Sequence, residues 1–91
     1  MTMVAKASPY KVLFRLADSD LELIKHLCLP EKIICEKFGI SRAAISMQLT
    51  RISVKLGVEN RTAVVVKALG LGLVTVDQLV YRDYNGKANS S

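Results

Sequence analysis

Residues that could carry catalytic or metal chemistry are few in this chain and stand apart. His26 is the only histidine and falls near the end of an expected helix, where a structural or surface role is favoured. Cys28 and Cys35 lie among apolar residues, which favours reduced thiols over a zinc site or a disulfide. The three acids between residues 18 and 22 have the spacing of helix capping, not of paired acid–base catalysis. We therefore expect no enzyme, no metal and no cofactor.

The charge pattern favours ionic contact with a polyanion. The 91 residues include 13 Lys and Arg against 8 Asp and Glu, a formal net charge of +5. Seven of these bases and only two of the acids lie between Lys32 and Lys67, so the excess is concentrated in the middle of the chain. A local field of this kind favours nucleic acid over a membrane surface. We see no signal peptide and no apolar run long enough to span a bilayer, and expect a cytoplasmic protein.

Helix caps and apolar spacing predict an all-α domain of four helices. Ser41 and Asn60 are suited to N-caps, and Gly39, Gly57 and Gly72 to left-handed helix ends. Ser19-Asp-Leu-Glu22 has the spacing of a capping box. The expected helices start at Ser19, Pro30, Arg42 and Asn60 and end near Leu27, Phe38, Leu56 and Leu71. No segment alternates with period two for long enough to compete as a strand.

The predicted domain covers residues 16–74 and has short extensions at both ends. Residues 1–15 are expected to hold a loose N-terminal arm and a short packing segment. The packing segment is Tyr10–Leu16, with Val12, Leu13 and Leu16 as its apolar residues. Residues 75–91 comprise a short helical turn, for which Thr75-Val-Asp-Gln78 is suited, and a flexible polar tail. The chain is therefore expected to hold one small domain.

The segment from Pro30 to Leu56 predicts a helix, a tight turn and a longer helix, as in a helix-turn-helix unit. In the longer helix Ile45, Leu49, Ile52 and Leu56 form an inward stripe. Small and hydroxyl side chains with flanking bases occupy the opposite side, and no acid occurs from Ser41 to Val58. Such a surface suits base edges, with phosphates bound at its margin. The expected DNA contacts are Arg42, Ala43, Ser46, Met47, Thr50, Arg51 and Lys55, together with Lys32 and Arg61.

The chain from Leu16 to Val74 resembles the LuxR/GerE-type helix-turn-helix domain of bacterial regulators. The resemblance is clearest in Ile40-Ser41, in Lys55-Leu-Gly-Val58 with Asn60-Arg-Thr62, and in Gly72-Leu-Val74. It implies a stand-alone, four-helix LuxR/GerE-like domain that binds double-stranded DNA through its third helix and dimerises through its fourth. The sequence departs from the family pattern inside the third helix. Ser46 and Gln48 stand where family members typically have Lys and His.

Two further expectations concern partners. Small residues on the fourth helix indicate a homodimer interface, formed by Ala63, Val66, Lys67 and Gly70. The alternative is that Tyr10–Leu16 or Val76–Val80 covers this stripe. The main function expected is sequence-specific regulation of transcription. The alternatives are a protein-binding regulator that blocks or recruits another transcription factor or RNA polymerase, and a non-specific nucleoid-type binder.

Overall fold

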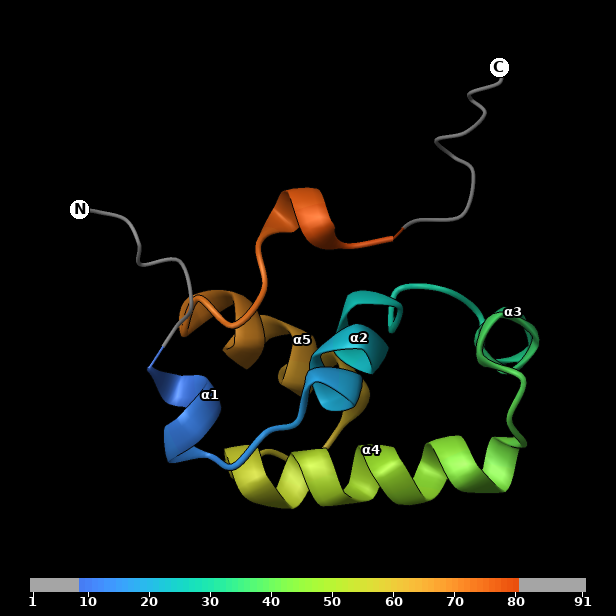
Figure 1. Ribbon diagram of the computed structural model, residues 1–91, viewed down its shortest axis with the longest axis horizontal. Coiled ribbons are helices and arrows are strands. Elements are labelled where there is room, and N and C mark those ends of the chain that lie inside the picture. Colours follow the sequence, from blue (N-terminus) through green and yellow to red (C-terminus); the bar gives the residue numbers. More distant parts are fainter. Residues whose placement is uncertain (1–8, 81–91) are drawn as a thin grey trace.

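A computed structural model of the chain describes residues 9–80, and all of their regular structure is helical. The α-helices are α1 (Tyr10–Leu13), α2 (Asp18–Lys25), α3 (Glu31–Phe38), α4 (Arg42–Leu56) and α5 (Arg61–Gly70), followed by a 3-10 turn, η2 (Val76–Gln78), as shown in Figure 1. The predicted all-α fold is confirmed. Most of the expected N-terminal arm (residues 1–8) and the expected tail (residues 81–91) lie outside the described residues.

The helices enclose one aliphatic core. α5 packs against α4 and α2, and α3 packs against α4. On α4, Ile45, Ile52 and Leu56 are at most 2% exposed, as the predicted inward stripe requires, while Leu49 is half-buried. Each buried aliphatic side chain contributes about 1.5–3 kcal/mol relative to an exposed one. The other core side chains are Leu16, Leu23, Ile24, Leu27, Leu29, Ile34, Val64, Ala68, Leu73, Val74 and Leu79.

The caps confirm the predicted end of α3, both ends of α4 and the start of α5, whereas Pro30, expected in the first turn of α3, precedes the helix. Ser41 Oγ and Asn60 Oδ1 accept the backbone N–H three residues ahead, at 3.1 Å and 2.8 Å. Gly39 and Gly57 follow α3 and α4 with φ of +66° and +72°, a left-handed conformation that glycine adopts without steric cost. These local signals set both ends of α4, the longest helix.

The start of α2 differs from the prediction. The helix begins at Asp18, after Ala17, not with Ser19 as its cap. The backbone N–H of Ala17 donates to Asp20 Oδ2 at 2.9 Å, which is the reciprocal half of a capping box. Ala17 has no side-chain oxygen for the other half. The predicted pair, Ser19 and Glu22, therefore lies in the correct segment but two residues too far along the chain.

The N-terminal packing segment is only partly correct. Leu16 is buried, but Val12 and Leu13 are 80% and 68% exposed. α1 has only four residues, and Arg15, two residues after its end, adopts a left-handed φ of +58°. This turn redirects the chain, so that Phe14 and Leu16 pack on the core instead.

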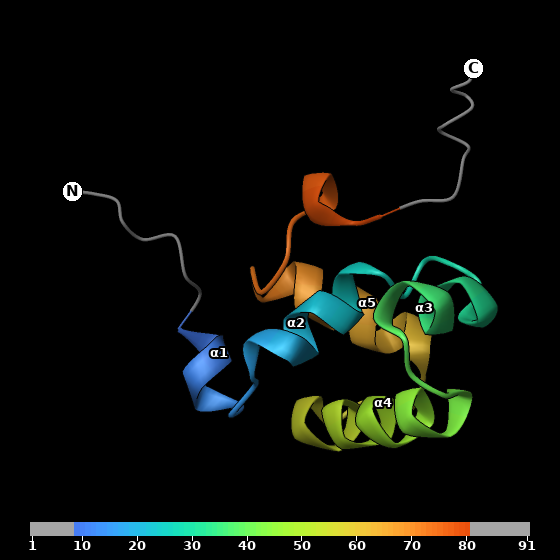
Figure 2. The ribbon, with the colours of Figure 1, turned by 45° about the vertical axis from the view of Figure 1, so that its right-hand side comes forward.

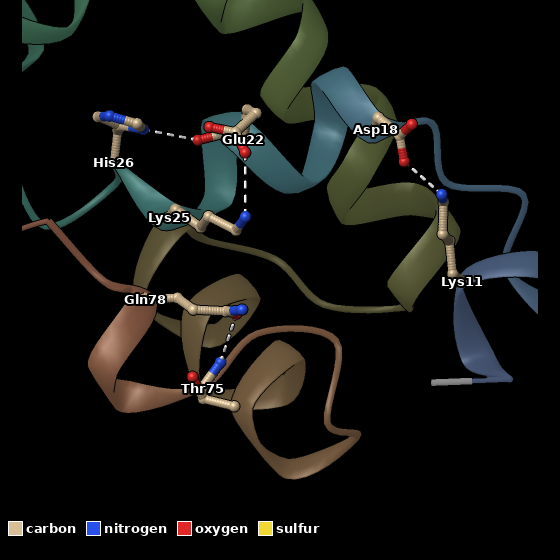
Figure 3. Close-up of polar contacts among 7 residues, drawn as sticks. All are labelled: Lys11, Asp18, Glu22, Lys25, His26, Thr75 and Gln78. Atoms are coloured by element: carbon tan, nitrogen blue, oxygen red, sulfur yellow. Dashed lines mark hydrogen bonds and ion pairs between the residues drawn. The ribbon is translucent and has the colours of Figure 1, made fainter. Parts of the chain in front are cut away.

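The predicted turn after α5 is present as η2. The backbone N–H of Thr75 donates to Gln78 Oε1 at 3.0 Å (Figure 3). Leu79 is buried, and the Val80 N–H donates to the Lys25 carbonyl oxygen at 2.8 Å. These contacts hold the segment after α5 against the end of α2. Within residues 9–80 no helix combines the length and apolar character needed to cross a membrane.

Candidate nucleic-acid interface

The long helix α4 lies at the edge of the molecule. Figures 1 and 2 both show it as the lowest helix, with no ribbon of the described chain on its outer side. In Figure 1 α3 is seen nearly end-on while α4 runs across the view, so the two helices cross steeply. The turn between them consists of Gly39, Ile40 and Ser41. One helix therefore braces the other and leaves its outer side open.

Most of the predicted contact residues on α4 share this open side. Ala43, Ser46, Thr50 and Arg51 are exposed, and Met47 is 63% exposed. Four of them, at positions 46, 47, 50 and 51, line a shallow open hollow with a mostly apolar surface. Two hydroxyl residues, a methionine and an arginine thus line a small hollow whose surface is mostly apolar.

The predicted basic residues divide into two groups, of which the first is open to solvent. Arg51 and Lys32 are exposed and have no side-chain hydrogen bond or ion pair within residues 9–80. The side chain of Arg42 is 76% exposed, and its Nε donates to Glu31 Oε1 of α3 at 3.0 Å. The Arg42–Glu31 pair links the first turn of α3 to the first turn of α4.

The second group is tied to the fold. Lys55 Nζ donates to the Arg15 carbonyl oxygen at 2.9 Å and lies 3.8 Å from Asp20 Oδ2. The Arg61 guanidinium donates to the carbonyl oxygen of Leu27 at 2.9 and 2.8 Å, and also to that of Leu29. Because these partners lie 32 to 40 residues away in sequence, no local pattern identifies them. Both side chains brace loops beside α2.

A buried contact that sequence reasoning missed connects α4 to α2. Asp20 is 7% exposed, and its Oδ1 accepts a hydrogen bond from Gln48 Nε2 at 3.1 Å. The same amide donates to the Ser19 carbonyl oxygen at 3.3 Å. Gln48 thus positions α4 against α2 from the side opposite the open face.

The stripe predicted as a dimer interface on α5 is partly open. Val66 is 61% exposed and Gly70 is exposed, whereas Ala63 is half-buried. Lys67 is also half-buried, and its Nζ lies 6.0 Å from the centre of the Phe14 ring. The Tyr10–Leu16 segment thus contacts one residue of the stripe and leaves the valine accessible.

Several other ionisable residues make contacts within the fold, some of which Figure 3 shows. Lys11 Nζ donates to Asp18 Oδ1; this hydrogen bond, reinforced by the lysine's charge, lowers the pKa of Asp18 below its ordinary 3.8. His26 Nδ1 lies 2.7 Å from the Glu22 carbonyl oxygen, and its ring meets Phe38 edge-on. Cys28 is exposed, so the prediction of two core thiols is wrong for this residue.

No family model, no curated protein and no solved structure matches this chain. Within residues 9–80 no three His, Cys, Asp or Glu side chains gather as a set of metal ligands. The function of the chain is therefore inferred from its own residues and their geometry.

Proposed function

We propose that the chain is a sequence-specific, DNA-binding transcription regulator of the cytoplasm, with a LuxR/GerE-like domain formed by α2 to α5. In this proposal α4 enters the major groove of a duplex. One observation carries it: the outer side of α4 is uncovered, and the segment from Ser41 to Val58 contains no acid. An ordinary solvated helix face carries mixed charges, whereas an acid-free face avoids repulsion by the phosphates and therefore suits a helix that lies in a groove of DNA.

The side chains of the open face have distinct roles in this arrangement. The hydroxyls of Ser46 and Thr50 hydrogen-bond to base edges, since a hydroxyl serves as either donor or acceptor. Arg51 and Lys32, which have no partner within residues 9–80, bind phosphates. Arg42 joins them from the first turn of α4, held in place by Glu31. Lys55 and Arg61 support the fold and are not assigned to the interface.

The proposal is tested by titrating the full chain with random and selected duplexes over a salt series. A selected duplex should bind at least tenfold more tightly than random DNA, with affinity falling steeply as salt rises. Arg51→Gln should weaken binding to every duplex and reduce the slope of log affinity against log salt by about one.

The matched control is Lys25→Gln, which removes the same charge elsewhere. Lys25 belongs to α2, away from α4, and pairs with Glu22 at 3.0 Å (Figure 3). This variant should retain the wild-type salt slope. Equal effects of the two substitutions would show that net charge, not the α4 face, controls binding, and would contradict the proposal.

We also propose a homodimer formed through α5, which would present two copies of α4 to half-sites about one helical turn apart. The exposed Val66 and Gly70 support it, because an apolar residue beside a small one allows close approach of two helices.

A second candidate function is a protein-binding regulator that uses the same face against another transcription factor or RNA polymerase. It is favoured by the exposed apolar side chains Met47 and Val54, the latter 74% exposed. Absence of binding to any duplex at low salt would support this function and reject the first.

A further inference from the structure

The hollow on the outer side of α4 is formed by two consecutive helical turns. Its lining residues, Ser46, Met47, Thr50 and Arg51, are related by the four-residue spacing that brings side chains together on a helix. The surface is mostly apolar although three of the four residues are polar. The thioether chain of Met47, the methyl group of Thr50 and the stem of Arg51 are the carbon-rich parts available to line it.

The surroundings of the hollow restrict what can occupy it. Arg51 is one of its lining residues and α4 contains no acid, so the complementary partner is negatively charged. An apolar depression in a basic face also requires a small apolar projection from that partner. The major-groove edges of DNA offer one such group, the C5-methyl of thymine. RNA helices lack this methyl and have a major groove too narrow for side chains.

We infer that this hollow reads the C5-methyl group of a thymine in double-stranded DNA. Met47 supplies the main contact, the Thr50 methyl completes it, and Arg51 holds the neighbouring phosphate. The inference rests on the proposed function and deepens it, since it assigns thymine at one fixed position of the bound sequence. It also makes Met47 a specificity-determining residue.

The test is single replacement of each thymine in the selected duplex by deoxyuridine. Deoxyuridine keeps every hydrogen-bonding group of thymine and removes only the methyl. Replacement at one position per bound copy should lower the affinity of the wild-type chain about fourfold. This is the change in dissociation constant expected when one methyl-sized apolar group is no longer buried. Other thymine positions should change little.

Two variants assign the effect to the hollow. Met47→Ala should bind the thymine and deoxyuridine duplexes equally, and because Met47 is 63% exposed the fold should persist, as circular dichroism can verify. The control is Val54→Ala, on the same helix and 74% exposed but outside the hollow. It should keep the wild-type ratio of the two affinities.

The outcomes separate this inference from the function on which it rests. Sequence-specific binding that no deoxyuridine replacement alters would overturn the thymine reading and leave the DNA-binding proposal standing. A Met47→Ala variant with the full thymine preference would overturn the assignment to the hollow. Failure to prefer any duplex would reject the proposed function and the inference with it.

Discussion

At the scale of single residues, Asp18 shows how the fold changes an ionisation. It lies in the first turn of α2, and Lys11 of α1 holds its pKa below 3.8 by a hydrogen bond and by its charge. A lowered pKa in the folded state stabilises the fold above the unfolded pKa, and this contribution is lost as pH falls through the folded value. The pair is exposed, so its net effect on stability is small.

We predict that Lys11→Met raises the pKa of Asp18 toward 3.8. The substitution removes both the hydrogen bond and the positive charge that lower this pKa, and it keeps an unbranched side chain at position 11. The measurement is an NMR titration of the Asp18 carboxyl carbon. Lys37→Met, which removes a charge from the end of α3, is the control and should leave this titration unchanged. If Lys11→Met also leaves it unchanged, the contact is not formed in solution.

At the scale of elements, the sequence was informative where the residue at a helix boundary is itself of a capping type. Ser41, Asn60 and Gly57 are such residues, and all three boundaries were predicted correctly. The start of α2 was not, although Asp20 accepts from the Ala17 N–H only three residues away, because Ala17 has no side-chain oxygen and gives no capping signal of its own.

The candidate interface was predicted less completely than the helices. Helical periodicity correctly identified the open side of α4, where Met47 and Thr50 are exposed. It could not separate Arg51, which has no side-chain hydrogen bond or ion pair in the described part of the chain, from Lys55 and Arg61. Their partners come from distant loops, and a helical wheel holds no information about tertiary neighbours.

The contact between Asp20 and Gln48 fixes α4 on α2 and gives a prediction for these elements. Asp20→Ala should lower the free energy of unfolding by about 2 kcal/mol, because the Ala17 N–H loses its acceptor and the half-buried Gln48 amide loses one of its two acceptors. Urea denaturation followed by circular dichroism measures it, with an unchanged m-value.

The control for this prediction is Ser19→Ala, on the adjacent position of the same helix. The Ser19 side chain is exposed and only its backbone carbonyl contacts Gln48, so the midpoint should move little. Equal midpoints for the two variants would mean that the Asp20 carboxylate does not hold α4.

At the scale of the whole molecule, the positive charge is less available than the composition suggests. Two of the basic residues predicted to bind DNA support the fold, and a third is paired with Glu31. The affinity of a protein for DNA grows with the number of phosphates that its Lys and Arg side chains neutralise. A single copy with few unpaired bases in its described residues therefore has limited affinity for DNA. Two linked copies bind far more tightly than one, since the second contact becomes intramolecular.

The proposed dimer is therefore tested by two substitutions matched in exposure. Val66→Glu, on α5, should raise the dimer dissociation constant by about tenfold or more, because two like charges would meet near the symmetry axis of the proposed interface. Val76→Glu alters a valine that is 62% exposed, against 61% for Val66, but belongs to η2. Sedimentation equilibrium should give the wild-type constant for this second variant. A wild-type chain that stays monomeric at high concentration, or equal constants for the two variants, would exclude α5 as the contact between copies.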